Sequence, residues 1–132
     1  MSLVLVADDD PRVGAIIRLT LAERGHVVGI VASGEEALRV VATKRPGLVI
    51  LDCAMPGIGG IEALHQIKSS NLSFDTPVLM LTGRLSHQDE EIALRAGADE
   101  YLRKPFDPTE LLVVAERLIA RSLSRRAACA RT

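Results

Sequence analysis

The sequence contains no tryptophan, one tyrosine and two phenylalanines, so aliphatic side chains must fill the core. The two cysteines, Cys53 and Cys129, are far apart and match neither a disulfide framework nor a metal-ligand spacing. This cysteine usage fits a reducing compartment. Long apolar runs are also missing, because the run Leu3–Ala7 ends in three aspartates and is far too short to cross a membrane. We therefore expect a cytoplasmic protein without membrane contact.

A strong net charge of either sign is absent as well. The formal net charge is −1, which gives no electrostatic basis for direct nucleic-acid binding by the chain as a whole. The C-terminal end alone is basic, since residues 113–132 contain five arginines and one glutamate. We interpret this end as a helix terminus followed by a solvated tail, with a linker or docking segment as the alternative.

Five short apolar runs alternate with helical patterns along the chain. Near-continuous apolar runs of this length are typical of strands that are buried on both faces of a parallel sheet. Alternation of such strands with helices predicts a doubly wound α/β fold with a five-stranded parallel sheet and five helices. We assign residues 1–122 to this single domain and residues 123–132 to a basic tail or the start of a linker. The predicted strands cover residues 3–7, 27–31, 48–51, 78–81 and 100–102.

Capping residues indicate where the helices begin. Asp10 and Asp107 each precede a proline, and both suit the N-cap position of a helix. Ser33 and Glu36 have the spacing of a capping box. Ser86 is predicted to cap the fourth helix.

Polar side chains follow the predicted strands at their carboxyl ends. Asp8 and Asp9 follow the first strand, Asp52 the third and Thr82 the fourth, while Lys104 comes after the fifth. In an open parallel sheet, ligands bind beyond the carboxyl ends of the strands. We therefore expect these side chains to converge at one edge of the sheet.

Three neighbouring carboxylates repel one another unless a cation compensates them. An all-oxygen ligand set favours Mg²⁺ over softer metals, and Mg²⁺ keeps coordination sites for phosphate oxygens. A carboxylate can also act as a nucleophile toward phosphorus while a lysine neutralises the transferring group. This combination points to phosphoryl chemistry, with Lys104 and the Thr82 hydroxyl close to the phosphoryl oxygens.

Four segments together resemble the receiver domain of bacterial-type response regulators. The resemblance runs from about Leu3 to Leu118, and it implies a flavodoxin-like strand order of 2-1-3-4-5. It also implies a cis peptide bond between Lys104 and Pro105. The segments read LVLVADD (3–9), LVILDCAMPG (48–57), PVLMLTG (77–83) and GADEYLRKPF (97–106).

The resemblance also assigns roles at the sheet edge. It implies that Asp52 is the phosphoacceptor and that Asp9, Asp52 and the backbone carbonyl of Ala54 bind Mg²⁺. Asp8 would hold a metal-bound water or assist in another way. Thr82 and Lys104 would bind the phosphoryl group.

The same resemblance implies a regulatory domain that assists its own phosphorylation and dephosphorylation, not an enzyme with a separate substrate. Tyr101 would turn from an outward to an inward position after Thr82 moves, changing the surface of the fourth helix, fifth strand and fifth helix. The implied partners are a sensor histidine kinase or histidine phosphotransfer protein, an output domain or effector, and a second copy in a homodimer.

Two other functions compete with this interpretation. A phosphatase of the haloacid dehalogenase type also uses an aspartate with Mg²⁺, but it would place the nucleophile after the first strand. A receiver-like binding module that acts independently of phosphorylation would retain the same pocket. Among the remaining reactive residues, we expect His26, His65 and His87 at the surface and Cys53 in the interior.

Overall fold

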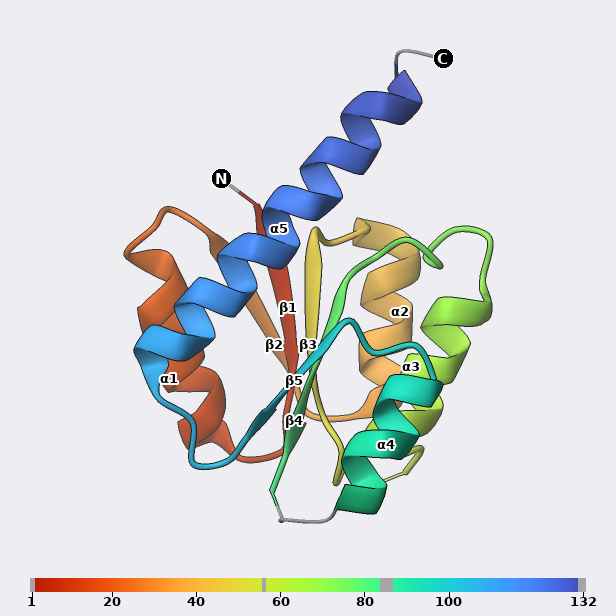
Figure 1. Ribbon diagram of the computed structural model, residues 1–132. Helices are drawn as coiled ribbons and strands as arrows, with labels where there is room; N and C mark the ends of the chain where they lie inside the picture. Colours follow the sequence, from red (N-terminus) through yellow and green to blue (C-terminus); the bar gives the residue numbers. More distant parts are fainter. Residues whose placement is uncertain (1, 56, 84–86, 131–132) are drawn as a thin grey trace.

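Each predicted strand forms in the computed structural model, which describes residues 2–55, 57–83 and 87–130. The strands pair in parallel in the order β2-β1-β3-β4-β5, which confirms the predicted order (Figure 1). Both β3 and β4 include the polar residue that follows their apolar run, Asp52 and Thr82 respectively. The strands are β1 (Leu3–Ala7), β2 (Val27–Val31), β3 (Leu48–Asp52), β4 (Val78–Thr82) and β5 (Glu100–Arg103).

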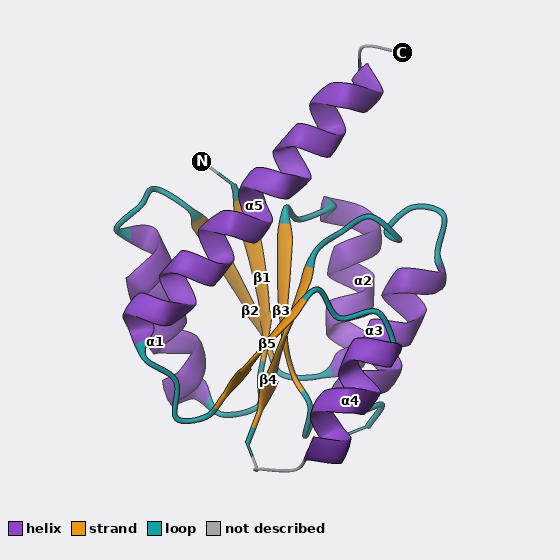
Figure 2. Ribbon diagram, viewed as in Figure 1, coloured by secondary structure: helices purple, strands orange, loops and turns teal. Residues whose placement is uncertain are grey.

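Helices cover both faces of the sheet. Figure 2 shows α1 and α5 on one side and α2, α3 and α4 on the other. This arrangement is the doubly wound fold predicted from the alternation of strands and helices. The helices are α1 (Pro11–Ala22), α2 (Gly34–Lys44), α3 (Gly60–Ser69), α4 (His87–Arg95) and α5 (Pro108–Ala130).

The sheet separates two apolar clusters because successive strand side chains point to opposite faces. Val4 belongs to the cluster beneath α1 and α5, whereas the next residue, Leu5, belongs to the cluster beneath the other three helices. All of the largest fully buried side chains are leucine, isoleucine or methionine. Each contributes roughly 1.5–3 kcal/mol on burial, so an aliphatic core suffices without aromatic residues.

Three of the four predicted helix caps are present. The side chains of Asp10 and Asp107 accept hydrogen bonds from the amides of Arg12 and Thr109, at 2.9 Å and 2.8 Å. The Ser33 hydroxyl accepts a bond from the Glu36 amide at 3.2 Å. Ser86, the fourth predicted cap, lies outside the described residues.

Among the reactive side chains, the expectation for His26 was wrong and that for Cys53 was met only in part. His26 is buried. Its Nδ1 atom lies 3.3 Å from the amide nitrogen of Ser2, and its Nε2 atom lies 3.2 Å from a carboxylate oxygen of Glu116 on α5. Cys53 is only half-buried. His65 is exposed, as predicted, and the side chain of His87 lies outside the described residues.

The fifth helix is longer than the sequence analysis anticipated. Residues 123–130, predicted to be a tail or linker, continue α5 beyond the sheet (Figure 1). The assignment of residues 1–122 as the domain stays a prediction. Among the described residues, no helix is both long and apolar enough to span a bilayer.

Candidate functional site

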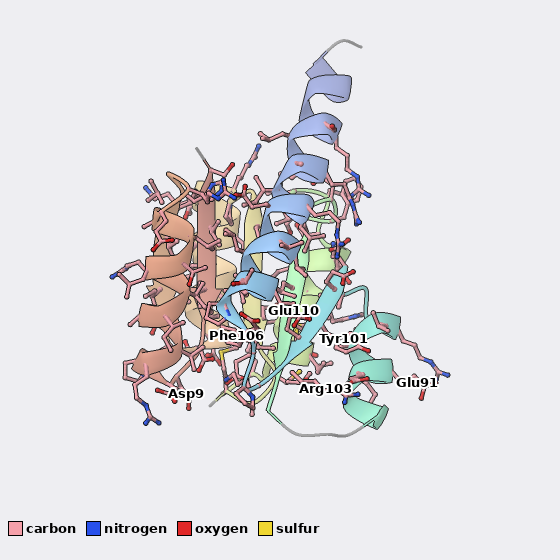
Figure 3. All side chains as sticks on the ribbon, turned by 60° about the vertical axis from the view of Figure 1, so that its left-hand side comes forward. Asp9, Glu91, Tyr101, Arg103, Phe106 and Glu110 are labelled. Carbon is pink, nitrogen blue, oxygen red and sulfur yellow. The ribbon has the colours of Figure 1, made fainter. Side chains whose placement is uncertain are left out.

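Three carboxylates converge where β1 and β3 end. Asp8 and Asp9 directly follow β1, and Asp52 is the last residue of β3. Because β1 and β3 are paired neighbours in the sheet, these ends lie side by side. One carboxylate oxygen from each residue lies within 4.8 Å of the other two. Asp8 and Asp52 are buried, whereas Asp9, labelled in Figure 3, is exposed.

Lys104 joins this cluster from the end of β5. Its Nζ atom lies 2.8 Å from Asp8 Oδ2 and 3.4 Å from Asp52 Oδ2. Its backbone amide donates to the carbonyl oxygen of Thr82 at 2.7 Å, which ties the chain after β5 to the end of β4. The Lys104-Pro105 bond is cis, which confirms the prediction. The convergence expected from the strand ends is therefore present.

The charges of this cluster, at the carboxyl end of the sheet, are unbalanced. Burial raises the pKa of the Asp52 carboxyl, and the negative charge of Asp8 raises it further. Burial lowers the pKa of Lys104, but its contacts with Asp8 and Asp52 outweigh that effect and raise it above the ordinary value. Lys104 therefore remains a cation, and the cluster keeps an excess of negative charge that a bound cation would compensate.

Backbone donors hold two of the carboxylates in place. Asp8 Oδ1 accepts a hydrogen bond from the amide of Asp10 at 2.9 Å, so both oxygens of Asp8 contact protein donors. Asp52 Oδ1 accepts one from the amide of Ala54 at 3.3 Å. Asp9 is the carboxylate most open to solvent. The cluster therefore combines two fixed carboxylates with one accessible carboxylate.

Thr82 is buried at the end of β4, beside the acidic cluster in the sheet order. Its hydroxyl oxygen lies 3.5 Å from the carbonyl oxygen of Leu102 on β5. Tyr101 is half-buried on the neighbouring strand and packs against the apolar cluster beneath α2, α3 and α4. The two predicted switch residues thus occupy adjacent strands.

The loop after β3 has supports that sequence analysis missed. Glu35, in the first turn of α2, accepts a hydrogen bond from the Ile58 amide at 2.9 Å. Gly60 begins α3 so close to β3 that a β-carbon there would lie 2.1 Å from the carbonyl oxygen of Asp52. Only glycine fits this approach. A helix-starting glycine soon after an acidic strand end was the available signal.

A second group of residues that sequence analysis missed lies between α4 and β5. Glu90 on α4 is buried and forms an ion pair with Arg103 of β5, and its carboxylate raises the pKa of Tyr101 on the same strand. No spacing pattern connects Glu90 with these residues, because the contact depends on how α4 packs against the sheet.

An apolar groove of about 430 Å³ borders the site on the side of α1. Lys104 and Gly83 are among its lining residues. Phe106, another lining residue, is half-buried and packs against the apolar cluster beneath α1 and α5. Its remaining lining residues are Val13, Ile16, Pro105 and Pro108.

The donor set fits a hard divalent cation. All side-chain ligand candidates in the cluster are carboxylate oxygens, and no sulfur or imidazole ligand from the described part of the chain joins them. Such a set suits Mg²⁺, which binds through few carboxylates and retains water or phosphate oxygens. The acidic cluster can therefore hold a metal ion.

The comparisons with known proteins agree with this geometry. The family model for the response regulator receiver domain matches residues 4–116. The chain belongs to this family. Receiver domains of two-component response regulators are phosphorylated by histidine kinases, and this is the general function of the family. The match also decides against the haloacid dehalogenase alternative.

Individual relatives show how far the likeness extends. The alkaline phosphatase synthesis transcriptional regulatory protein PhoP of Bacillus subtilis is 35% identical over 90% of this chain and 49% of its own length. The response regulator MprA of Mycolicibacterium vanbaalenii is 40% identical over 90% of this chain and 51% of its own. This receiver domain thus spans about half the length of these curated relatives. Because one of them is a transcriptional regulator, the absence of nucleic-acid contact stays a prediction.

Solved structures of receiver domains superpose closely on this chain. The receiver domain of the Francisella response regulator 1452 matches with a TM-score of 0.85 and 32% identity, covering 92% of this chain and 99% of its own. The chemotaxis response regulator CheY4 of Vibrio cholerae matches with a TM-score of 0.83 and 32% identity, covering 89% of this chain and 98% of its own.

Proposed function

We propose that Asp52 is the phosphoacceptor of this receiver domain and that the phosphoryl group comes from a phosphohistidine. The donor protein would be a sensor histidine kinase or a histidine phosphotransfer protein. The observation that carries this proposal is the position of Asp52, a buried carboxylate beside both Asp8 and Lys104 at the carboxyl end of the sheet. A cytoplasmic location is part of the same proposal.

Mg²⁺ would bind next to the phosphoacceptor. Asp9, Asp52 and the backbone carbonyl of Ala54 would be its direct ligands. Both oxygens of Asp8 already contact protein donors, which favours binding through a water molecule for this residue. When bound, the metal would neutralise negative charge on the phosphoryl oxygens.

The transfer itself requires little of the protein beyond positioning and charge. A carboxylate oxygen of Asp52 attacks phosphorus, the new P–O bond forms, and the P–N bond to the donor imidazole breaks with its electron pair staying on nitrogen. Lys104 stabilises the negative charge of the transferring group, and the Thr82 hydroxyl donates to one of its oxygens. These residues would assist both phosphorylation and the later hydrolysis of the aspartyl phosphate.

Phosphorylation would then shift a population between two conformations. Thr82 would move toward the phosphoryl group, and Tyr101 would turn inward into the space it leaves. The surface formed by α4, β5 and α5 would change and alter contact with an output domain, an effector protein or a second copy of the chain. These partners belong to the proposal, since the chain covers only half of its curated relatives.

Intact-mass measurement after incubation with acetyl phosphate and Mg²⁺ tests the proposal. We expect one phosphoryl adduct that is stable in acid and labile in base, and that requires Mg²⁺. Asp52→Asn should abolish it. Asp75→Asn, which changes an aspartate in the loop before β4, should leave it unchanged.

Two results would contradict the proposal. An adduct of equal yield in Asp52→Asn would assign the phosphoacceptor elsewhere. Failure of labelling with acetyl phosphate, phosphoramidate and a phosphorylated histidine donor would instead favour a binding module that acts independently of phosphorylation.

A further inference from the structure

The connection between β3 and α3 carries one of the proposed metal ligands, the backbone carbonyl of Ala54. It is short, because β3 ends at Asp52 and α3 begins at Gly60. Backbone hydrogen bonds hold its two ends. The amide of Cys53 donates to the carbonyl oxygen of Leu81 at 3.0 Å, and the amide of Gly60 donates to the carbonyl oxygen of Cys53 at 3.2 Å. The position of the ligand between these ends depends on how the rest of the connection is held.

The helix that follows this connection lacks a side-chain cap. The N-caps of α1 and α2 are Asp10 and Ser33, and each side chain accepts a hydrogen bond from the backbone of its own helix. The N-cap of α3 is Gly59, which forms no such bond. A helix start without a side-chain cap leaves backbone amides that need other partners. Support for the residues before α3 therefore has to come from another element.

The first turn of α2 supplies this support. Both α2 and α3 cover the same side of the sheet (Figure 2). Oε1 of Glu35 on α2 accepts a hydrogen bond from the Ile58 amide at 2.9 Å. This bond lowers the pKa of Glu35, so the carboxylate is ionised at neutral pH. A β-carbon on Gly57 would lie 2.5 Å from the same oxygen, and one on Gly34 would lie 2.7 Å from the carbonyl oxygen of Ile58. The start of α2 thus lies directly against the backbone of the connection.

We propose that Glu35 is a positioning residue for the metal site and that its hydrogen bond to Ile58 holds the Ala54 carbonyl within reach of Mg²⁺. The inference rests on the proposed role of Ala54 as a metal ligand. Ile58 lies four residues beyond Ala54, so Glu35 acts through the backbone between them. Glu35 is not one of the three clustered carboxylates, and it is not a ligand itself in this proposal.

The expected effect is a change in Mg²⁺ affinity. Residues that hold a metal ligand in place typically contribute roughly 10- to 100-fold to metal affinity. Glu35 is exposed, and water can replace part of its hydrogen bond. We therefore expect loss of the acceptor to weaken Mg²⁺ binding by roughly 10-fold, at the lower end of that range. The maximal rate of Asp52 labelling at saturating Mg²⁺ should stay close to wild type, because Glu35 has no proposed contact with the phosphoryl group.

Mg²⁺ titrations followed by backbone amide signals in nuclear magnetic resonance measure this affinity without a phosphodonor. We would compare the wild-type chain, Glu35→Gln, Glu35→Met and the matched control Glu62→Met. Glu35→Gln removes the charge but keeps an oxygen acceptor, whereas Glu35→Met removes both. Glu62 is also an exposed glutamate in the first turn of a helix, but it accepts a hydrogen bond from Gln66 of the same helix, at 3.1 Å.

We expect Glu35→Met to raise the Mg²⁺ dissociation constant roughly 10-fold, while Glu35→Gln and Glu62→Met stay near wild type. Hydrogen exchange of the Ile58 amide should become faster in Glu35→Met alone. With acetyl phosphate, the Mg²⁺ concentration for half-maximal labelling of Asp52 should rise in Glu35→Met without loss of the maximal rate, a split that general damage to the fold would not produce. Urea midpoints check folding, and Glu35→Ala replaces Glu35→Met if the latter does not fold.

The outcomes separate this inference from the proposed function. If Glu35→Met binds Mg²⁺ as tightly as wild type, the positioning role is wrong. If Glu35→Gln loses as much affinity as Glu35→Met, the effect comes from charge and not from the hydrogen bond, and the role is also wrong. If Mg²⁺ leaves the amide signals around Ala54 unchanged in wild type, the role fails with the metal site. If Mg²⁺ binds but Asp52 is never labelled, the proposed function fails, while the affinities of the variants still decide the role of Glu35.

Discussion

Two lysines at opposite ends of the sheet pair with aspartates, one at the candidate site and one far from it. Lys104 contacts Asp8 at the carboxyl end of the strands, and Lys68 contacts Asp99 at 2.9 Å near the amino ends of β4 and β5. Lys68 also donates to the carbonyl oxygen of Thr76 at 2.7 Å. Each ion pair is only slightly exposed, so burial alone does not distinguish a structural pair from a functional one.

The balance of charge distinguishes them. At the amino end, the Asp99 carboxylate faces two cations, Lys68 and the more distant Arg121. At the carboxyl end, three carboxylates share a single paired cation among the described residues, Lys104. Excess negative charge of this kind weakens the fold unless a cation is present. The imbalance of charge therefore distinguishes the cluster that can hold a metal ion from the structural ion pair, and the following predictions test that distinction.

Lys104→Met should give the largest change. It removes the cation that we propose stabilises the transferring phosphoryl group, so the rate of labelling by acetyl phosphate should fall on the order of 10²-fold or more. Lys68→Met, the same substitution at the other pair, should leave the rate of the folded protein unchanged. Equal rate losses in the two variants would remove the distinction between the pairs.

Asp99→Ala should give the largest loss of stability. It leaves Lys68 without its carboxylate and the Val78 amide without its acceptor, which lies at 2.8 Å. Breaking a fully buried pair costs about 3–5 kcal/mol, and slight exposure reduces this to about 2 kcal/mol. Urea denaturation measures the loss, and Glu23→Ala, at an exposed carboxylate, should differ little from wild type.

Asp52→Asn should change stability in the opposite direction. We expect its free energy of unfolding to be higher than that of wild type by roughly 1 kcal/mol at neutral pH without Mg²⁺. Burial and Asp8 raise the pKa of Asp52, so folding favours its protonated form. In wild type, that contribution is complete below the ordinary carboxyl pKa and is lost as pH rises through the raised value. The advantage of the variant should therefore shrink in acid, and a constant difference across pH would contradict this account.

Arg121→Ala should have the smallest effect. Its guanidinium lies 3.5 Å from Asp99 and its side chain is 40% exposed, so the pair contributes at most about 0.5 kcal/mol. Thermal denaturation at low and high salt measures it. A loss comparable to that of Asp99→Ala would mean that Asp99 depends on both cations equally.

The sequence predicted the strands and the acidic edge because both depend on local patterns. Apolar runs specify buried parallel strands, and the first polar residue after a run therefore lies at the carboxyl end of its strand. This position does not depend on contacts with distant parts of the chain. Asp8, Asp52, Thr82 and Lys104 were accessible to this reasoning. The family resemblance added their roles, which geometry alone does not assign.

The buried polar contacts were not predictable in the same way. His26 is buried because Glu116, distant in sequence, reaches it from α5. Glu90 is buried where α4 packs against β5, and Arg103 of that strand forms an ion pair with it. Each residue would be an unremarkable surface group in a local pattern. Their burial follows from helix packing, which no short-range spacing encodes.

The contact between Asp8 and Lys104 joins residues 96 positions apart in the sequence. Contacts of such long range form late, because the chain between them must first lose its conformational freedom. A nascent or partly unfolded chain therefore has its carboxylates long before it has the lysine that completes the site. Phosphoryl transfer consequently reports on the folding of the whole domain, and a chain that has not added β5 to the sheet cannot carry the signal.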